Sequence, residues 1–87
     1  MTFIKDPDAT LDYTVDWSEW LGEDVIESAD WVAPAGLTVE SESHTATTAT
    51  VWLSGGQAGR EYAVVSRIVT AGGREDDRTI TIKVMGK

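Results

Sequence analysis

The chain lacks several features that hold small domains together or carry catalysis. Its 87 residues include no cysteine, so neither a disulfide nor a thiolate–zinc site can stabilise the fold. No run approaches the roughly 18 apolar residues that a membrane-spanning helix needs. A domain of this size buries about 60–65% of its unfolded surface, which leaves little room for a deep cleft beside the core. These absences disfavour a membrane partner and most enzymes.

Positive charge is also scarce. Lys and Arg number 7 against 15 Asp and Glu, which gives a net charge of −8. This balance argues against nucleic acid as a partner, because Lys and Arg drive binding to phosphates. The deficit is uneven: residues 1–44 hold eleven acidic residues and one basic residue, whereas residues 45–87 hold four acidic and six basic residues. The first half is therefore strongly acidic and the second half slightly basic.

The start of the chain, MTFIKDPDAT, has no apolar core of the kind found in signal peptides. Because the chain begins with Met and ends shortly after a strand-like run, we expect a complete small gene product that is made and kept in a cytoplasm. Residues 1–9 are predicted to form an N-terminal arm or an edge strand. Residues 10–87 are predicted to form a single domain.

Alternation of polar and apolar residues is what the sequence has in abundance, and it is typical of half-buried strands. Only WSEWLG at residues 17–22 suggests a helical turn. In residues 24–32, turning Trp31 inward also turns Glu27 inward unless a bulge intervenes. Strands separated by Gly-rich or charged turns predict an all-β protein, an immunoglobulin-like β-sandwich of six to seven antiparallel strands. The predicted strands span residues 11–17, 24–32, 37–43, 48–54, 61–70 and 79–85.

The segment WLSGGQAGREYAV at residues 52–64 raises the question of phosphate binding. A P-loop needs a Lys followed by Ser or Thr and then a helix, and here a β-rich run follows instead. Glycine reaches positive φ at little cost, so a tight corner between two strands is the favoured interpretation. Tyr62, just after this corner, is a candidate for the tyrosine that hydrogen-bonds back across it in immunoglobulin-like sandwiches; a simple buried tyrosine is the alternative.

The outward positions of the strands provide candidate partner-binding residues. Four tryptophans are present, of which Trp17 and Trp31 fit inward positions and Trp20 fits the end of the sandwich. Trp52 falls opposite its inward neighbours and is predicted to face outward, as are Val65 and Val69. An apolar patch of this kind on a small protein commonly marks an interface, so we expect these residues to form one. The alternative is that neighbouring strands cover them.

The uneven charge suggests a second feature of the surface. If the first two strands lie in one sheet and the last two in the other, Asp12 and Asp16 face outward on one side, and Arg67 and Lys83 on the other. Opposed acidic and basic faces favour head-to-tail self-association into rings or stacks. The candidate partner-binding residues are thus Trp52, Val65, Arg67, Val69, Asp12 and Asp16.

Other candidate chemistry is weak. His44 is the single histidine and lies in a polar stretch, where a solvated loop residue is the favoured interpretation. The acids at residues 6, 8 and 12 and at 75–77 are possible calcium ligands, but the EF-hand pattern is absent. Carboxylate pairs are too numerous in this chain to indicate a glycosidase. We predict no catalytic residue, no metal site and no cofactor.

The order and spacing of several segments resemble small tailed-phage and prophage proteins of the phage fiber-tail adaptor family. The matching residues are KDPDATLDYTVDWSEWL (Lys5 to Leu21), Ser28 with Trp31, WLSGG followed by Gly59 and Tyr62, and Gly72, Gly73, Arg74, Asp77 and Arg78. The resemblance covers most of the chain. It implies an immunoglobulin-like domain in the virion, without known catalytic residues.

Two functions follow as hypotheses. The first is a non-enzymatic virion structural protein that acts as an assembly adaptor, linking tail or fibre components through protein–protein contacts. Its location is then the virion, after synthesis in the host bacterial cytoplasm. The alternative is a carbohydrate-binding immunoglobulin-like module on a virion surface, in which exposed Trp52 and Trp20 stack on a sugar beside carboxylates.

Overall fold

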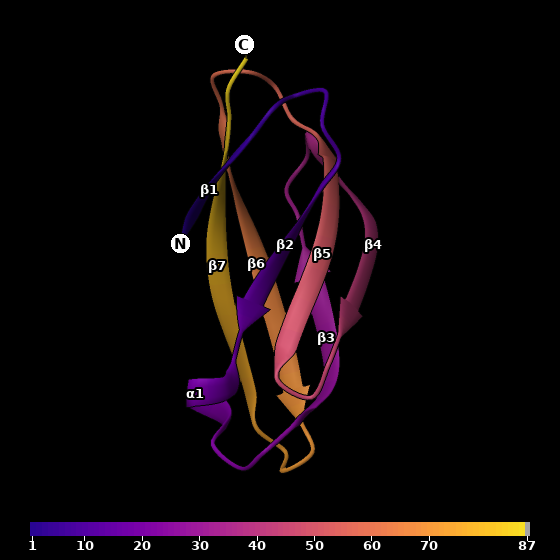
Figure 1. Cartoon of the computed structure of the whole chain (residues 1–87), viewed down its shortest axis with the longest axis vertical. Coiled ribbons are helices and arrows are strands. Elements are labelled where there is room, and N and C mark those ends of the chain that lie inside the picture. The colour runs from indigo at the N-terminus through magenta and orange to yellow at the C-terminus, as the bar shows by residue number, and fades with distance from the viewer. Residues whose placement is uncertain (87) are drawn as a thin grey trace.

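A computed structural model, which describes residues 1–86, shows two packed β-sheets and one short helix in an elongated molecule of 43 × 20 × 17 Å (Figure 1). The elements in chain order are β1 (Thr2–Lys5), β2 (Leu11–Asp16), α1 (Ser18–Leu21), β3 (Ile26–Val32), β4 (Leu37–His44), β5 (Thr48–Gly55), β6 (Glu61–Thr70) and β7 (Glu75–Val84).

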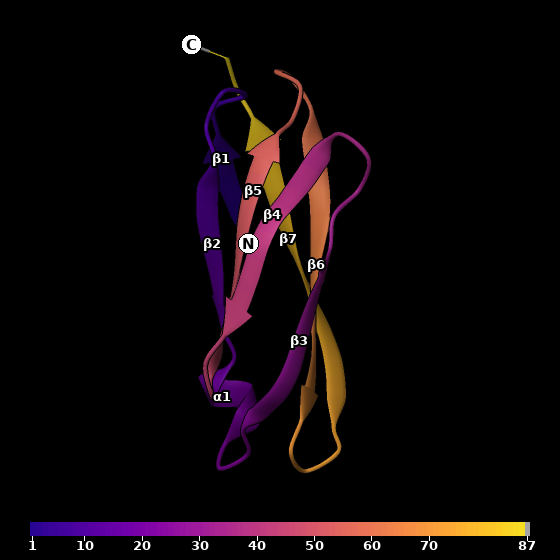
Figure 2. The same ribbon diagram turned by 90° about the vertical axis from the view of Figure 1, so that its right-hand side faces the viewer.

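The two sheets lie face to face (Figures 1 and 2). The three-stranded sheet has the order β2-β5-β4, and the four-stranded sheet has the order β1-β7-β6-β3. The arrangement β2-β5-β4 opposite β7-β6-β3 is that of the immunoglobulin sandwich, so the predicted fold class is confirmed. Two details differ from the prediction: β1 pairs with β7 in parallel, and β2 and β3 lie in different sheets.

The core lies between the sheets and is built from the inward positions of the alternating strands. Along β6, for example, buried and more exposed residues alternate from Glu61 to Thr70. Trp17 and Trp31 are buried, as predicted, and Trp20 packs against the core from α1. The apolar residues with no exposed surface are Val15, Trp17, Ala49, Val51, Leu53, Val64, Ile68, Ile80 and Ile82.

A bulge resolves the predicted conflict in β3. The pairing of β3 with β6 shifts register between Ile26 and Ser28, so Glu27 is exposed while Ile26 and Trp31 are buried. The extra residue lets both apolar side chains reach the core from one strand.

The last strand begins earlier than predicted. The sequence places AGGREDD, residues 71–77, in a charged turn and starts the last strand at Thr79, but residues 75–78 already continue β7 alongside β6. Arg67 of β6 lies opposite Asp77 of β7, and its Nε donates to Oδ1 of that aspartate at 2.9 Å. A cross-strand ion pair therefore supports a strand whose residue types disfavour it.

At one end of the sandwich, the predicted corner between β5 and β6 is confirmed. Gly55, Gly56 and Gly59 all have positive φ, and a Cβ on Gly56 would lie 2.6 Å from Val84. The Tyr62 hydroxyl accepts a hydrogen bond from the Gln57 backbone N–H at 2.9 Å. This is the tyrosine corner of immunoglobulin-like sandwiches, and the glycines act in a turn.

A buried lysine joins the two sheets at the same end. Lys5 of β1 is only 1% exposed, and its Nζ donates to the carbonyl oxygens of Gly55, at 2.7 Å, and Asp6, at 2.9 Å. Desolvation lowers the pKa of Lys5, while Asp6 and Asp8 oppose the shift. β1 of the four-stranded sheet is thus tied to the end of β5 in the three-stranded sheet.

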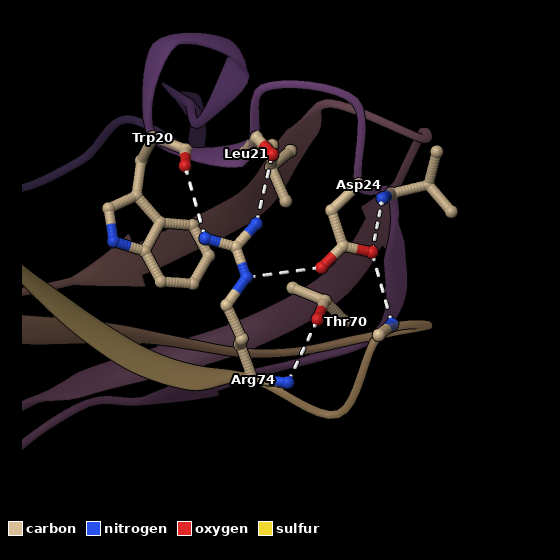
Figure 3. Close-up of polar contacts among 7 residues, drawn as sticks. Trp20, Leu21, Asp24, Thr70 and Arg74 are labelled. Carbon is tan, nitrogen blue, oxygen red and sulfur yellow. Dashed lines mark hydrogen bonds and ion pairs between the residues drawn. The ribbon is translucent and has the colours of Figure 1, made fainter.

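At the other end, Arg74 joins α1 to the β6–β7 hairpin (Figure 3). Its guanidinium lies 4.3 Å from the centre of the Trp20 ring and donates to the carbonyl oxygens of Trp20 and Leu21. It also forms an ion pair with Asp24 at 3.2 Å. We call the residues Trp20, Leu21, Asp24 and Arg74 the end cluster. It connects the segment after β2, in one sheet, to the hairpin of the other.

Candidate interaction surfaces

The outer face of the three-stranded sheet is acidic. β2, β4 and β5 contain no Lys or Arg. Their outward and exposed positions carry carboxylates, hydroxyls and one aromatic ring. We call this surface the acidic face; its main residues are Asp12, Thr14, Asp16, Glu40, Ser41, Ser43, Thr50 and Trp52.

Trp52 lies at the centre of the acidic face. It is on the middle strand, β5, and lies opposite Asp12 of β2 on one side and Ser41 of β4 on the other. Its side chain is 42% exposed, which answers whether it belongs to the core or to the surface. The next level of the sheet is polar, because the hydroxyls of Thr14 and Thr50 are 2.9 Å apart. A large aromatic ring is thus presented among groups that favour a charged or polar partner.

Asp16 lies at the end of the acidic face nearest α1. Its carboxylate accepts a hydrogen bond from the Ser18 backbone N–H at 2.9 Å, and this bond lowers the pKa of Asp16. Its carbonyl oxygen accepts a bond from Arg78, whose guanidinium lies 4.3 Å from the centre of the Trp17 ring. Both aspartates are exposed, but the bonds to Ser18 and Arg78 fix Asp16 at the end of the sheet, whereas Asp12 lies beside Trp52.

The outer face of the four-stranded sheet is different in character. Its middle is weakly polar or apolar, with Val32, which is 51% exposed, beside Val65 and Thr79. Charged residues flank this strip above and below. We call this surface the paired face; its central β6 and β7 residues are Glu61, Ala63, Val65, Arg67, Asp77, Thr79, Thr81 and Lys83.

The paired face is not basic, which corrects the expectation drawn from the uneven charge of the sequence. Arg67 forms an ion pair with Asp77 and lies opposite Asp30 in the pairing with β3. The hydrogen bond from Arg67 to Asp77 raises the pKa of the arginine. Lys83 lies 3.7 Å from Glu61. The strand pairing therefore places a carboxylate beside each of these cations.

The predicted single apolar patch is also not formed. Trp52 belongs to the acidic face, whereas Val65 and Val69 belong to the paired face on the opposite side of the sandwich. The two sheets and the core separate them. The structure thus divides the candidate residues into two sets: Asp12, Asp16 and Trp52 on one side, and Val65, Arg67 and Val69 on the other.

The remaining candidates do not converge on a reactive site. His44 is exposed at the end of β4, near the carbonyl oxygen of Thr45. Within residues 1–86, no group of three or more His, Asp or Glu side chains is arranged to hold a metal ion. A shallow hollow beside Arg67 is lined by Glu75, Asp76 and Asp77. The described part of the chain has no helix long and apolar enough to cross a membrane.

Sequence reasoning missed the residues that fix the ends of the sandwich. In the sequence, Lys5 is the one basic residue of an acidic first half, and a lysine is rarely buried, so its burial under the end of β5 is not predicted. Arg74 and Arg78 entered only through the resemblance, although an arginine near a tryptophan-bearing turn is a signal for stacking. The carbonyl groups that they bind lie more than 50 residues away in the sequence, so these contacts could not be predicted without knowing the fold.

The fold and its surfaces define a class of protein: a small immunoglobulin-like domain that presents two flat sheet faces, which suits contact with other macromolecules. The comparison with protein families agrees, since residues 5–83 match the family described as podophage GP4 fiber-tail adaptor protein gp77. The chain belongs to this family. No curated protein matches it. Membership gives the chain a structural adaptor role in the phage tail, a location in the virion and contacts with other virion proteins; the family is not known as enzymatic.

Proposed function

We propose that this chain links tail and fibre components by docking its acidic face onto a basic surface of a neighbouring virion protein. The observation that carries the proposal is the position of Trp52: a large exposed ring on the central strand of a sheet whose strands contain no Lys or Arg. Tryptophan is enriched among the residues that dominate binding energy when they lie near the centre of an interface.

The charge of the acidic face defines the chemistry of its partner. Asp12 and Asp16 on β2 and Glu40 on β4 lie on either side of the strand that carries Trp52. An arginine of the partner can stack on the indole ring and donate to the neighbouring carboxylate of Asp12. Charge complementarity of this kind favours one partner and orientation over others.

A flat sheet face suits an adaptor better than a catalyst. Trp52 projects from a regular strand, held by antiparallel pairing on both sides, so its position is fixed before binding. A preformed contact avoids the entropic cost of ordering a loop on association.

The experiment is incorporation into particles that lack this protein. Such particles are mixed with the purified chain and sedimented, and the bound chain is quantified. We expect Trp52→Thr to lower the affinity for the particle at least about tenfold, because the ring is lost while a residue that favours strands remains. The matched control is Val25→Thr, since Val25 is 41% exposed but lies in the α1–β3 connection outside both faces.

A second experiment tests the contribution of the carboxylates of the acidic face separately from that of the Trp52 ring. Asp12→Lys with Asp16→Lys is expected to weaken incorporation as strongly as Trp52→Thr, because two repulsive contacts replace two attractive ones. Normal incorporation of both variants would overturn the assignment of the acidic face.

The sugar-binding alternative has weaker support. Arg74 covers one face of the Trp20 ring, and Trp20 lies at the end cluster, away from the sheet that carries Trp52. The two aromatic rings therefore do not form one platform. Glycan binding that depends on Trp52, together with normal incorporation of Trp52→Thr, would favour the sugar-binding function over docking.

A further inference from the structure

We propose that the paired face binds a second copy of this chain, with the two faces stacked about a two-fold axis that runs across the strands. This inference concerns the face opposite Trp52 and does not rest on the proposed docking function. It replaces the head-to-tail association expected from the sequence, because the cations of the paired face are already matched by carboxylates and present no basic face to the acidic one.

The pairing of β6 with β7 divides the paired face into levels. Side chains at every second residue point outward, so each level contains one outward residue from each of the two strands. The four central levels are Glu61 with Lys83, Ala63 with Thr81, Val65 with Thr79, and Arg67 with Asp77. The outer levels are charged and the inner levels are uncharged.

A two-fold axis between the levels of Ala63 and Val65 makes this face complementary to itself. Such an axis keeps β6 and β7 each over its own copy and reverses the order of the levels. Glu61 of one copy then lies over Arg67 of the other. In the same way, Lys83 lies over Asp77, so every charge that β6 and β7 contribute to these levels meets the opposite sign.

The inner levels provide the apolar part of the contact. Val65 of one copy lies over Ala63 of the other, and Thr79 lies over Thr81. Val32 widens this strip on the β3 side, where its side chain is 51% exposed. Small and β-branched side chains let two sheets approach closely, as the sheets inside a sandwich do.

An axis along the strands, between β6 and β7, gives a poorer contact. It also places opposite charges together, because Glu61 then lies over Lys83 of the other copy. However, it places Val69 over Glu75, since these two residues share the next level. Burying a carboxylate against a valine carries a desolvation cost. The axis across the strands places Val69 beyond the start of β6 in the other copy, so this valine does not lie over a carboxylate.

The size of the surface sets the expected strength. β6 and β7, about 4.8 Å apart over roughly seven residues of 3.3 Å each, give about 220 Å² per copy, because β1 and β3 run along only part of the four levels. Two copies then bury roughly 450 Å², which is below the area of a stable specific interface and corresponds to a weak contact. We expect a dimer with a dissociation constant in the upper micromolar range, which closes on itself because the contact is two-fold.

Two charge exchanges test the arrangement. The first variant combines Glu61→Lys with Lys83→Glu, and the second combines Arg67→Asp with Asp77→Arg. Each keeps an opposite-charge pair within the chain, but each brings like charges together across the proposed dimer. We expect each variant alone to dimerise at least about tenfold more weakly than the wild-type chain. Sedimentation velocity over a micromolar concentration series gives the dissociation constants.

The two variants mixed together provide the strongest test. The lysine introduced by Glu61→Lys in one copy meets the aspartate introduced by Arg67→Asp in the other, and the remaining contacts are also of opposite sign. The mixture is therefore expected to recover wild-type association as a heterodimer, and recovery also shows that both variants are folded. A wild-type chain that stays monomeric overturns the proposal. A single variant that dimerises like the wild type also overturns it, because that result requires the axis along the strands or a contact through another surface.

Discussion

The two outer faces of this sandwich enclose the same core but differ in how their charges are arranged. The acidic face has carboxylates with no Lys or Arg on its three strands, and one tryptophan at its centre. The paired face has cations and carboxylates side by side, around an uncharged strip. A surface of unbalanced charge suits a partner of different chemistry, whereas a surface of balanced charge suits a copy of itself.

The difference shows that the charge of a sequence segment does not give the charge of a face. The second half of the chain is slightly basic, but antiparallel pairing places Asp77 beside Arg67 and Glu61 beside Lys83. These partners are ten and 22 residues apart in the sequence. Whether these charges neutralise one another therefore depends on the register of the β6–β7 hairpin, which cannot be predicted from the composition.

The largest predicted effect tests whether Trp52 belongs to the surface. Leu53, its neighbour on β5, has no exposed area and faces the core. We expect Leu53→Ala to lower the free energy of unfolding by about 3 kcal/mol, through lost burial and a residual cavity. Trp52→Ala is expected to cost less than about 1 kcal/mol, because its outward ring is only partly covered.

Urea denaturation of both variants gives these values. Equal losses in free energy of unfolding would mean that Trp52 is required for folding. β5 would then not have one side that serves binding, at Trp52, and another that serves stability, at Leu53.

The fold was largely readable from the sequence because alternation reports directly on which side of a strand is buried. The six strands predicted from that pattern are all present, and the bulge in β3 was foreseen from the conflict between Glu27 and Trp31. Residues 75–78 were missed, because three consecutive acids resemble a turn until Arg67 is placed opposite Asp77.

The candidate surfaces were less readable. The alternation within each strand predicts that Trp52 and Val65 face outward. It does not predict the sheet to which each strand belongs. The predicted apolar patch joined Trp52 of β5 to Val65 and Val69 of β6, which lie in different sheets. Assigning β2 and β3 to one sheet led to the predicted basic face, which is also not formed. Sheet membership depends on pairing between distant strands, and no pattern within a single strand encodes it.

A smaller effect is expected at the corner that fixes β5 relative to β6. Tyr62→Phe removes the acceptor for the Gln57 backbone N–H, and we expect a loss of about 1 kcal/mol in the free energy of unfolding. Tyr13→Phe is the matched control, because the Tyr13 hydroxyl is buried without a hydrogen-bond partner among residues 1–86.

Removing the Tyr13 hydroxyl is expected to be neutral or stabilising, since an unpaired buried polar group carries a desolvation cost. Thermal unfolding of the two variants under one set of conditions gives the comparison. If Tyr13→Phe lowers the free energy of unfolding as much as Tyr62→Phe does, the hydrogen bond from Gln57 to Tyr62 makes no specific contribution to stability. The corner would then not be what fixes β5 relative to β6.

The smallest effect concerns acid stability at the end cluster, which joins the two sheets at the opposite end. Hydrogen bonds to the Asp24 carboxylate, first from the Thr70 hydroxyl and then from the backbone N–H groups of Val25 and Gly72 and from Arg74, lower its pKa from 3.8 to about 2. Because the folded state holds this group ionised, its stabilising contribution is present above pH 4 and is lost as the pH falls toward 2.

Asp24→Asn is therefore expected to lower the free energy of unfolding at neutral pH and to flatten its decline between about pH 4 and pH 2. Asp12→Asn removes the same charge from the exposed acidic face and is the control for the change in net charge. Urea denaturation across this pH range measures both profiles. An unchanged slope in Asp24→Asn would show that the end cluster does not couple protonation to the packing of the two sheets.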